Sequence, residues 1–199
     1  EILRCLVGSE MCIRDRRIPC DAIWMDIDYM DGYRIFTFNP QGFPDPKAVN
    51  RDLHLRGFHS VWMIDPGAKA ETGYSVYDSG TANDVWVKTV DGKEYNGDAW
   101  PGKVAWPDFT DPKVCQWWGG LYKDFMAQGV DGVWNDVNEP QVSNTPTGTM
   151  PEDNLHRGGN GIPAGTHLQY HNVYGFLMVK SSREGMLAAQ PKKRPFILT

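Results

Sequence analysis

The residues best suited to do chemistry in this chain lie together in residues 129–139. A short apolar run, Val133 and Trp134, ends there in polar groups that include Asp136 and Glu139. The core of a buried strand does not tolerate an unpaired charge, so carboxylates appear where the strand leaves the core. Carboxylates placed in this way suit the hydrolysis of a glycosidic bond. Asp136 is therefore the strongest catalytic candidate. Glu139 is close enough to support it, or else only helps to turn the loop.

Two other apolar runs also end in an acid. Residues 22–25 are followed by Asp26, and residues 61–64 are followed by Asp65. Parallel strands joined by right-handed crossovers share one rim at their carboxyl ends. We therefore expect Asp26, Asp65 and Asp136 to converge on that rim. The alternative is that each acid only caps the loop after its strand.

Support for a metal or another cofactor is weak, and we expect neither. Asp26, Asp28 and Asp31 alternate as oxygen ligands of a divalent cation would, but apolar residues separate them and the Gly turn of an EF-hand loop is missing. The cysteines and histidines show no metal-ligand spacing, so we interpret the histidines as structural hydrogen-bonding residues. These residues are Cys5, Cys12, Cys20, Cys115, His54, His59, His156, His167 and His171.

Strand and helix signals alternate along the chain, and these elements must position the acids. The sequence predicts strands at residues 22–25, 61–64, 132–134 and 195–198, and helices at residues 46–56, 112–128 and 167–189. Asp45, Asp111 and Thr166 fit the N-cap positions of the helices. In the first helix we expect Val49, Leu53 and Leu55 to face the core. Residues 67–106 are predicted to be an aromatic, Gly-rich insertion.

This alternation predicts βαβ units and a parallel sheet. A doubly wound sheet would also fit, but its G-x-G-x-x-G marker is missing, so a barrel is favoured. The predicted fold class is α/β, a partial (β/α)8 TIM barrel with about four of the eight strands. Residues 17–199 would form this catalytic domain. Residues 1–16 resemble translated adapter read-through, or else a disordered terminus, and receive no function.

Composition narrows the classes of partner. The 199 residues carry a formal net charge of -5, which argues against nucleic acid, because phosphate binding requires clustered Lys and Arg. No apolar stretch approaches the roughly 20 residues of a membrane span. No signal peptide is recognisable, and compartment and oligomeric state stay undetermined. The eight Trp, eight Tyr and eight Phe offer flat faces that suit sugars, and we expect the rim to be surrounded by Trp24, Trp62, Trp100, Trp106 and Trp134.

Several ordered motifs between about residues 19 and 199 resemble glycoside hydrolase family 31, the retaining α-glucosidase group. They are M-D-I-D-Y-M (25–30), F-P (43–44), D-P (65–66), W-P-G (100–102), P-D-F (107–109), W-N-D-V-N-E-P (134–140), H-N-V-Y-G (171–175) and R-P-F-I-L-T (194–199). One such match would be weak, but the ordered series is specific. The D-I-D-Y-M and N-E-P forms are more similar to the α-glucosidase branch than to the α-xylosidase branch.

The resemblance implies a role for particular residues. Asp136 would be the catalytic nucleophile, and Asp26 would hydrogen-bond hydroxyl groups of the non-reducing sugar. Trp100 and Trp134 would line the subsite for that sugar. The side chains with a lesser role in the pocket wall would be Ile27 and Met63.

One expected element is missing from the sequence. The general acid/base of the family is an aspartate in a W-x-G-D segment downstream of R-P-F-x-L-T, and it does not occur in residues 1–199. The resemblance thus implies a retaining, exo-acting α-glucosidase that acts on oligosaccharides or α-glucosides, with this chain supplying the nucleophile. We expect the isolated chain to be inactive and poorly soluble. The alternatives are an α-xylosidase, α-galactosidase or transglucosidase, or a non-catalytic carbohydrate-binding barrel.

Overall fold

Four strands form one parallel sheet in the computed structural model, which describes residue 16 and residues 18–199. They are β1 (Ala22–Met25), β2 (His59–Ile64), β6 (Gly132–Asn135) and β9 (Phe196–Leu198). Their order across the sheet, β1-β2-β6-β9, is their order along the chain, and every neighbouring pair is parallel. This is the arrangement of a (β/α)8 barrel, so the predicted fold class is confirmed. Except for residue 16, the segment 1–16 lies outside the described residues.

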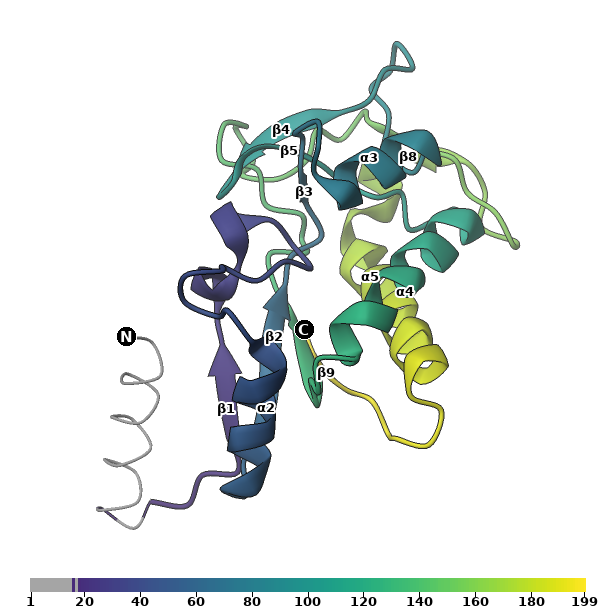
Figure 1. Ribbon diagram of the computed structural model, residues 1–199. Coiled ribbons are helices and arrows are strands. Elements are labelled where there is room, and N and C mark those ends of the chain that lie inside the picture. The colour runs from purple at the N-terminus through teal and green to yellow at the C-terminus, as the bar shows by residue number, and fades with distance from the viewer. Residues whose placement is uncertain (1–15, 17) are drawn as a thin grey trace.

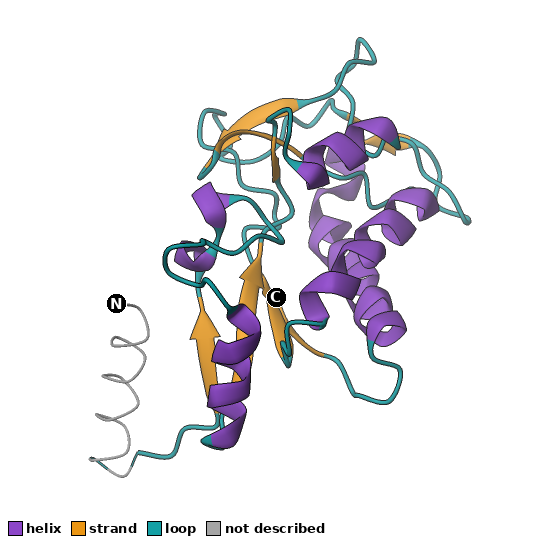
Figure 2. Cartoon of the chain, in the orientation of Figure 1, coloured by secondary structure: helices purple, strands orange, loops and turns teal. Residues whose placement is uncertain are grey.

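Three long helices begin where the capping signals predict. They are α2 (Pro46–Leu55), α4 (Pro112–Met126) and α5 (His167–Ala189). The Asp45 carboxylate accepts a hydrogen bond from the backbone N–H of Ala48 at 2.8 Å, and the Asp111 carboxylate accepts one from the N–H of Lys113 at 2.9 Å. Each cap satisfies a donor that the first turn leaves free. Figure 2 shows α4 and α5 packed along each other beside the sheet.

The helices cover one face of the sheet, and the alternation of side chains along each strand decides what they contact. The indole N–H of Trp62 donates to the side-chain oxygen of Asn50 on α2 at 3.1 Å. Val49 and Leu53 of α2 are buried, as predicted. The prediction for Leu55 was wrong, because its side chain is 80% exposed. Two residues correspond to about 200° around a helix, so Leu53 and Leu55 lie on opposite sides.

The insertion between β2 and α4 has a structure of its own that the sequence did not predict in detail. It contains β3 (Ala68–Lys69), α3 (Ser75–Ala82), β4 (Asn96–Ala99) and β5 (Gly102–Ala105). The three strands form an antiparallel sheet in the order β3-β5-β4. Figure 1 shows that the arrows of β1 and β2 point toward this second sheet, which therefore lies over the carboxyl ends of the parallel strands.

Shorter elements complete the rim. Two turns of 3-10 helix follow β1, η1 (Ile27–Tyr29) and η2 (Asp31–Tyr33). The two-stranded pair β7 (Leu155–His156) and β8 (Gly165–Thr166) precedes α5. All of these segments follow the carboxyl end of a parallel strand, the end that carries the site in barrel enzymes.

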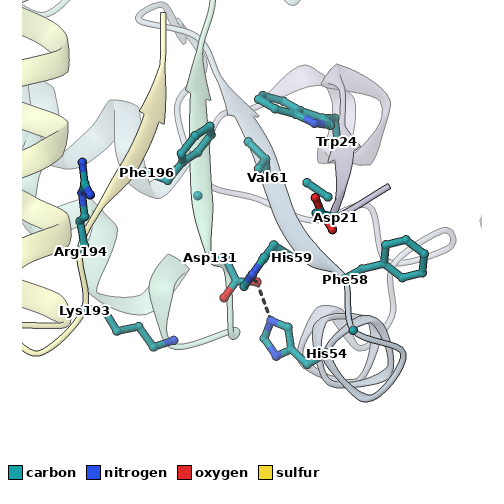
Figure 3. Close-up of a pocket in the computed structure, with 13 residues that line it drawn as sticks. Asp21, Trp24, His54, Phe58, His59, Val61, Asp131, Lys193, Arg194 and Phe196 are labelled. Carbon is teal, nitrogen blue, oxygen red and sulfur yellow. Dashed lines mark hydrogen bonds and ion pairs between the residues drawn. The ribbon is translucent and has the colours of Figure 1, made fainter. Parts of the chain in front are cut away.

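The inner face of the parallel sheet, opposite the helices, is open. Strand register aligns Trp24, Val61, Gly132 and Phe196 in one row, and a hollow of about 730 Å³ surrounds this row (Figure 3). Asp131, hydrogen-bonded to His54 at 2.6 Å, marks its lower border, at the amino ends of the strands. The hollow is therefore the lower part of the barrel interior, and it lies at the opposite end of the strands from the acids.

Candidate active site

The strand-end acids meet at the carboxyl-terminal rim. Ile64 of β2 pairs with Asn135 of β6 in the last rung of the ladder, so Asp65 and Asp136 occupy the next position on neighbouring strands. The backbone N–H of Asp136 donates to the carbonyl oxygen of Ile64 at 3.4 Å, which extends the ladder beyond that rung. The charge of Asp26, at the end of β1, acts on Asp65 together with the charge of Asp136. The convergence predicted from the sequence is present.

Asp65 has the most unusual environment of these acids. Its side chain is buried, at 6% exposed, and its Oδ1 atom has no hydrogen-bond partner. Burial, and then the negative charges of Asp136, Asp26 and Glu139, raise the pKa of Asp65 to about 8. Loss of hydration and nearby like charges both disfavour the ionised form. Asp65 is therefore mostly protonated at pH 7.

A strained turn follows Asp136. Val137 has a φ of 46°, a left-handed conformation that is unfavourable for a β-branched residue. Asn138 secures the turn because its side-chain N–H₂ donates to Thr199 Oγ1 at 2.7 Å. Gly175 of α5 lies so close that a methyl group there would be 3.1 Å from the Asn138 side chain. The loop therefore leaves the sheet abruptly at Asp136, and strain of this kind clusters at functional sites.

Asp26 is held at the rim by the segment that follows it. Its Oδ1 atom accepts a hydrogen bond from the N–H of Ile27 at 2.7 Å. The buried hydroxyl of Tyr29 donates to the carbonyl oxygen of Met63 at 2.6 Å, which fastens η1 to the end of β2. The Asp26 side chain stays exposed, whereas Ile27 is half-buried against the core. No hydrogen bond from the described residues engages the second carboxylate oxygen of this exposed side chain.

The other predicted site residues lie on two levels. Met63 pairs with Trp134 in register, so both side chains belong to the inner face below the acids. The indole of Trp134 packs edge-to-face on Trp24, with ring centroids 6.3 Å apart. Trp100 lies at the turn between β4 and β5 and is 67% exposed. With Asp65 it borders a cavity of about 20 Å³.

Two of the five tryptophans expected around the rim are instead part of the core. Trp62 is 0% exposed and points toward α2. Trp106 is 1% exposed and stacks on Tyr95, with ring centroids 5.5 Å apart. A fully packed indole has no face left for a sugar, so this expectation was wrong for both residues. Glu139 lies exposed on the loop after β6, where its charge reaches Asp65.

A buried chain of polar side chains supports the rim, and the sequence did not point to it. Asp108 accepts a hydrogen bond from His156 Nδ1 at 2.8 Å. His156 Nε2 lies 3.1 Å from His167 Nδ1, and His167 Nε2 lies 3.4 Å from His171 Nδ1. Burial, and then the neighbouring histidines, lower the pKa of His167 to about 3. These three histidines therefore form hydrogen bonds within the fold, as predicted.

Two kinds of feature are absent from the described part of the chain. No group of three His, Cys, Asp or Glu side chains within it is arranged to hold a metal ion. Among its helices, none combines the length and the apolar character that a membrane crossing requires.

Together, the parallel strands, the helices on one face and the acids at the carboxyl-terminal rim define part of a (β/α)8-barrel domain with an acidic site. The chain belongs to glycoside hydrolase family 31. The family's model, described as "Glycosyl hydrolases family 31 TIM-barrel domain", matches residues 11–199. The resemblance inferred from the ordered motifs is thereby confirmed.

Relatives of known structure and activity agree with this family. Alpha-glucosidase 2 of Bacillus thermoamyloliquefaciens is 43% identical over 185 residues, which are 93% of this chain and 23% of that protein. The crystal structure of a family 31 alpha-glucosidase from Bacteroides thetaiotaomicron matches with a TM-score of 0.79 and 70% identity, over 94% of this chain and 29% of that one. The alpha3-Glc2-bound glucosidase II alpha subunit matches with a TM-score of 0.84 and 35% identity, over 93% and 20%. The chain thus spans between 20% and 29% of the length of these relatives.

Proposed function

We propose that this chain carries the nucleophile of a retaining, exo-acting α-glucosidase that removes terminal α-linked glucose. Asp136 attacks the anomeric carbon and forms a covalent glycosyl-enzyme, while a second carboxylic acid protonates the leaving oxygen. Water then hydrolyses the intermediate, and the anomeric configuration is retained. Asp136 takes the role of nucleophile, and no residue of this chain is assigned the role of general acid/base.

The position of Asp136 carries this proposal. It stands at the first position beyond β6, on the rim where barrel enzymes place their chemistry, and next to the rim acids Asp26 and Asp65. The half-exposed side chain is accessible to a sugar, in contrast to the buried Asp65. The activity of the relatives favours glucose as the sugar, since each of the three is described as an alpha-glucosidase or a glucosidase.

The surrounding residues suit the recognition of a terminal glucose. Asp26 has a free carboxylate oxygen for sugar hydroxyl groups, and Glu139 supports the acidic rim. Trp134 and the exposed Trp100 offer aromatic faces for the apolar side of the ring. We assign Ile27 and Met63 a lesser part, as apolar wall of the subsite.

A trapping experiment on the intact gene product that contains residues 1–199 tests the nucleophile. A 5-fluoro-α-glucosyl fluoride should label the protein, and peptide mass spectrometry should place the sugar on Asp136. Asp136→Asn should abolish labelling and lower kcat by at least about 10³-fold, whereas Asp153→Asn, an exposed acid elsewhere, should leave both unchanged. Tight glucoside binding without an Asp136 adduct would favour the non-catalytic carbohydrate-binding barrel instead.

The sugar specificity needs a separate comparison. Turnover of aryl α-glucoside, α-xyloside and α-galactoside by the same protein should favour the glucoside. A preference for α-xyloside or α-galactoside, or transfer to a sugar acceptor in place of water, would identify one of the three related activities. We also propose that the 199-residue polypeptide alone does not hydrolyse aryl α-glucosides. Turnover by that polypeptide that disappears in Asp136→Ala would contradict this.

A further inference from the structure

The buried carboxyl group of Asp65 is not used by the proposed mechanism. It lies one strand away from Asp136 at the same level of the sheet, but it is closed off from solvent, with its Oδ1 atom unpartnered. The adjoining cavity of about 20 Å³ has room for about one water molecule. An ionised carboxylate in this place would lose most of its hydration, and its Oδ1 atom has no hydrogen-bond donor, which makes the neutral acid the favoured form.

Within the described residues, none of the charged side chains that act on Asp65 is a cation. Those that act on its charge are Asp136 from the end of β6, Asp26 from the end of β1, and Glu139 from the loop after β6. Tyr29 of η1 also interacts with Asp65. Burial is the main reason that the pKa of the Tyr29 hydroxyl is raised, and the charge of Asp65 raises it further. The Tyr29 hydroxyl donates to the Met63 carbonyl oxygen. The charges that act on Asp65 are therefore all negative.

We propose that Asp65 is a positioning residue, a protonated acid that donates its hydrogen to the carboxylate of Asp136 and fixes which oxygen of Asp136 faces the sugar. This inference rests on the proposed role of Asp136 as nucleophile. A carboxyl O–H···O⁻ hydrogen bond is among the stronger kinds available to a protein. It binds one oxygen of Asp136 and leaves the other for attack.

The position of Asp65 separates this role from that of a general acid. A retaining glycosidase needs its acid and nucleophile astride the glycosidic bond, with about 5 Å between the carboxyl groups and both reaching the substrate. Asp65, at the end of β2, is buried. Asp136, at the end of the neighbouring strand β6, is half-exposed at the open rim. Asp65 acts through Asp136 and does not touch the leaving group.

The ionisation of Asp65 can be measured without any substrate. Carboxyl-carbon NMR of aspartate-labelled protein should show one resonance that titrates near pH 8 and disappears in Asp65→Asn. Asp136→Asn removes the negative charge that raises the pKa of Asp65 most after burial, and should lower that midpoint by about one pH unit or more. Asp153→Asn should leave the midpoint unchanged. A midpoint for Asp65 below about pH 5, close to the value of a free aspartate, would overturn the proposal.

Kinetics of the intact gene product test the positioning role. Asp65→Asn keeps a neutral donor and should retain kcat within about tenfold, whereas Asp65→Leu should lower kcat by about 100-fold with little change in KM. The fall in kcat above about pH 8 should vanish in Asp65→Asn. An equal loss in both variants, or a loss in Asp65→Asn that grows with the basicity of the leaving group, would overturn the proposal and indicate a structural residue or a general acid.

The two proposals fail separately. A missing Asp136 adduct, together with an Asp65 midpoint near pH 8 that falls in Asp136→Asn, would remove the assigned nucleophile and leave the hydrogen-bonded pair in place. Circular dichroism of each variant checks that it is folded. The NMR titration itself is measured on the parent protein, and the only variant it requires is Asp65→Asn, which assigns the resonance.

Discussion

Gly119 of α4 and Gly185 of α5 touch backbone to backbone. A methyl group at Gly185 would lie 2.5 Å from the carbonyl oxygen of Gly119, well inside normal contact. The same interface is joined by Ser182, whose hydroxyl accepts hydrogen bonds from the Trp118 indole at 3.0 Å and the Tyr122 hydroxyl at 2.9 Å. The helices α4 and α5 therefore approach each other so closely at these two glycines that no side chain fits between them.

Gly185→Ala should separate the helices and destabilise the chain. Overpacking of this kind costs about 1–3 kcal/mol in the free energy of unfolding, which urea denaturation can measure. Gly120→Ala is the matched control, because Gly120 follows Gly119 on α4, is exposed, and has no atom within 4 Å of an added methyl group. That change should stabilise the helix by up to about 1 kcal/mol. Equal effects of the two changes would contradict the close contact.

The chain should lose stability in acid because of the histidines behind the rim. The pKa of His167 is lowered to about 3, so the folded protein holds this ring neutral while an unfolded histidine gains a proton near pH 6.5. The contribution of His167 is complete above about pH 6.5 and is lost as the pH falls toward 3. Asp108 acts in the same direction: although burial opposes ionisation, His156 and other donors lower its pKa.

Urea denaturation at pH 7.5 and pH 5, values on either side of a normal histidine pKa of about 6.5, measures this effect. His167→Gln should reduce the difference in unfolding free energy between the two conditions. His59→Gln, at an exposed histidine, should leave that difference unchanged. A parent protein that is as stable at the lower pH as at the higher one would contradict the prediction.

Relief of the backbone strain at Val137 should increase the free energy of unfolding. Asn tolerates the left-handed conformation better than a β-branched residue, so Val137→Asn should raise the free energy of unfolding by about 1 kcal/mol. The same change should lower the activity of the intact gene product, because the turn orients Asp136. Val142→Asn places a polar group at a fully buried site without strain, and should destabilise by about 1–3 kcal/mol. A loss of stability in Val137→Asn as large as that in Val142→Asn would refute the strain.

Two tryptophans should respond in opposite ways to truncation. Trp100 is 67% exposed and Trp62 is 0% exposed. Trp62→Ala empties the core and should cost about 3–5 kcal/mol. Trp100→Ala should change stability by less than about 1 kcal/mol but raise the KM for aryl α-glucoside by about tenfold or more, since a stacked aromatic face is lost. Unchanged KM in Trp100→Ala would remove this residue from the subsite.

The parallel sheet was predictable because its signals are local. Asp45 and Asp111 cap their helices, and apolar runs define β1, β2 and β6. The proximity of Asp65 and Asp136 could be predicted because both residues follow parallel strands, whose carboxyl ends share one rim. The protonation of Asp65 did not, because it depends on how completely the rim segments cover that side chain.

Features that depend on distant contacts were not predictable. Asp108 and His156 are 48 positions apart, and no spacing rule connects them. The division of the tryptophans between the core and the rim also required the fold. Trp62 is buried because its position in β2 faces the helices, and Trp100 is exposed because it stands at a hairpin turn.

The antiparallel sheet β3-β5-β4 contributes to the substrate site without forming part of the parallel sheet that holds the catalytic acids. It presents Trp100 at the rim, yet its strands exchange no ladder with the four parallel strands that carry the acids. A change in the length or sequence of the β4–β5 hairpin can therefore reshape the approach to Asp136 and leave the parallel scaffold intact. Natural variation in the terminal sugar that is accepted should accumulate in this hairpin, and directed evolution toward new glycosides should begin there.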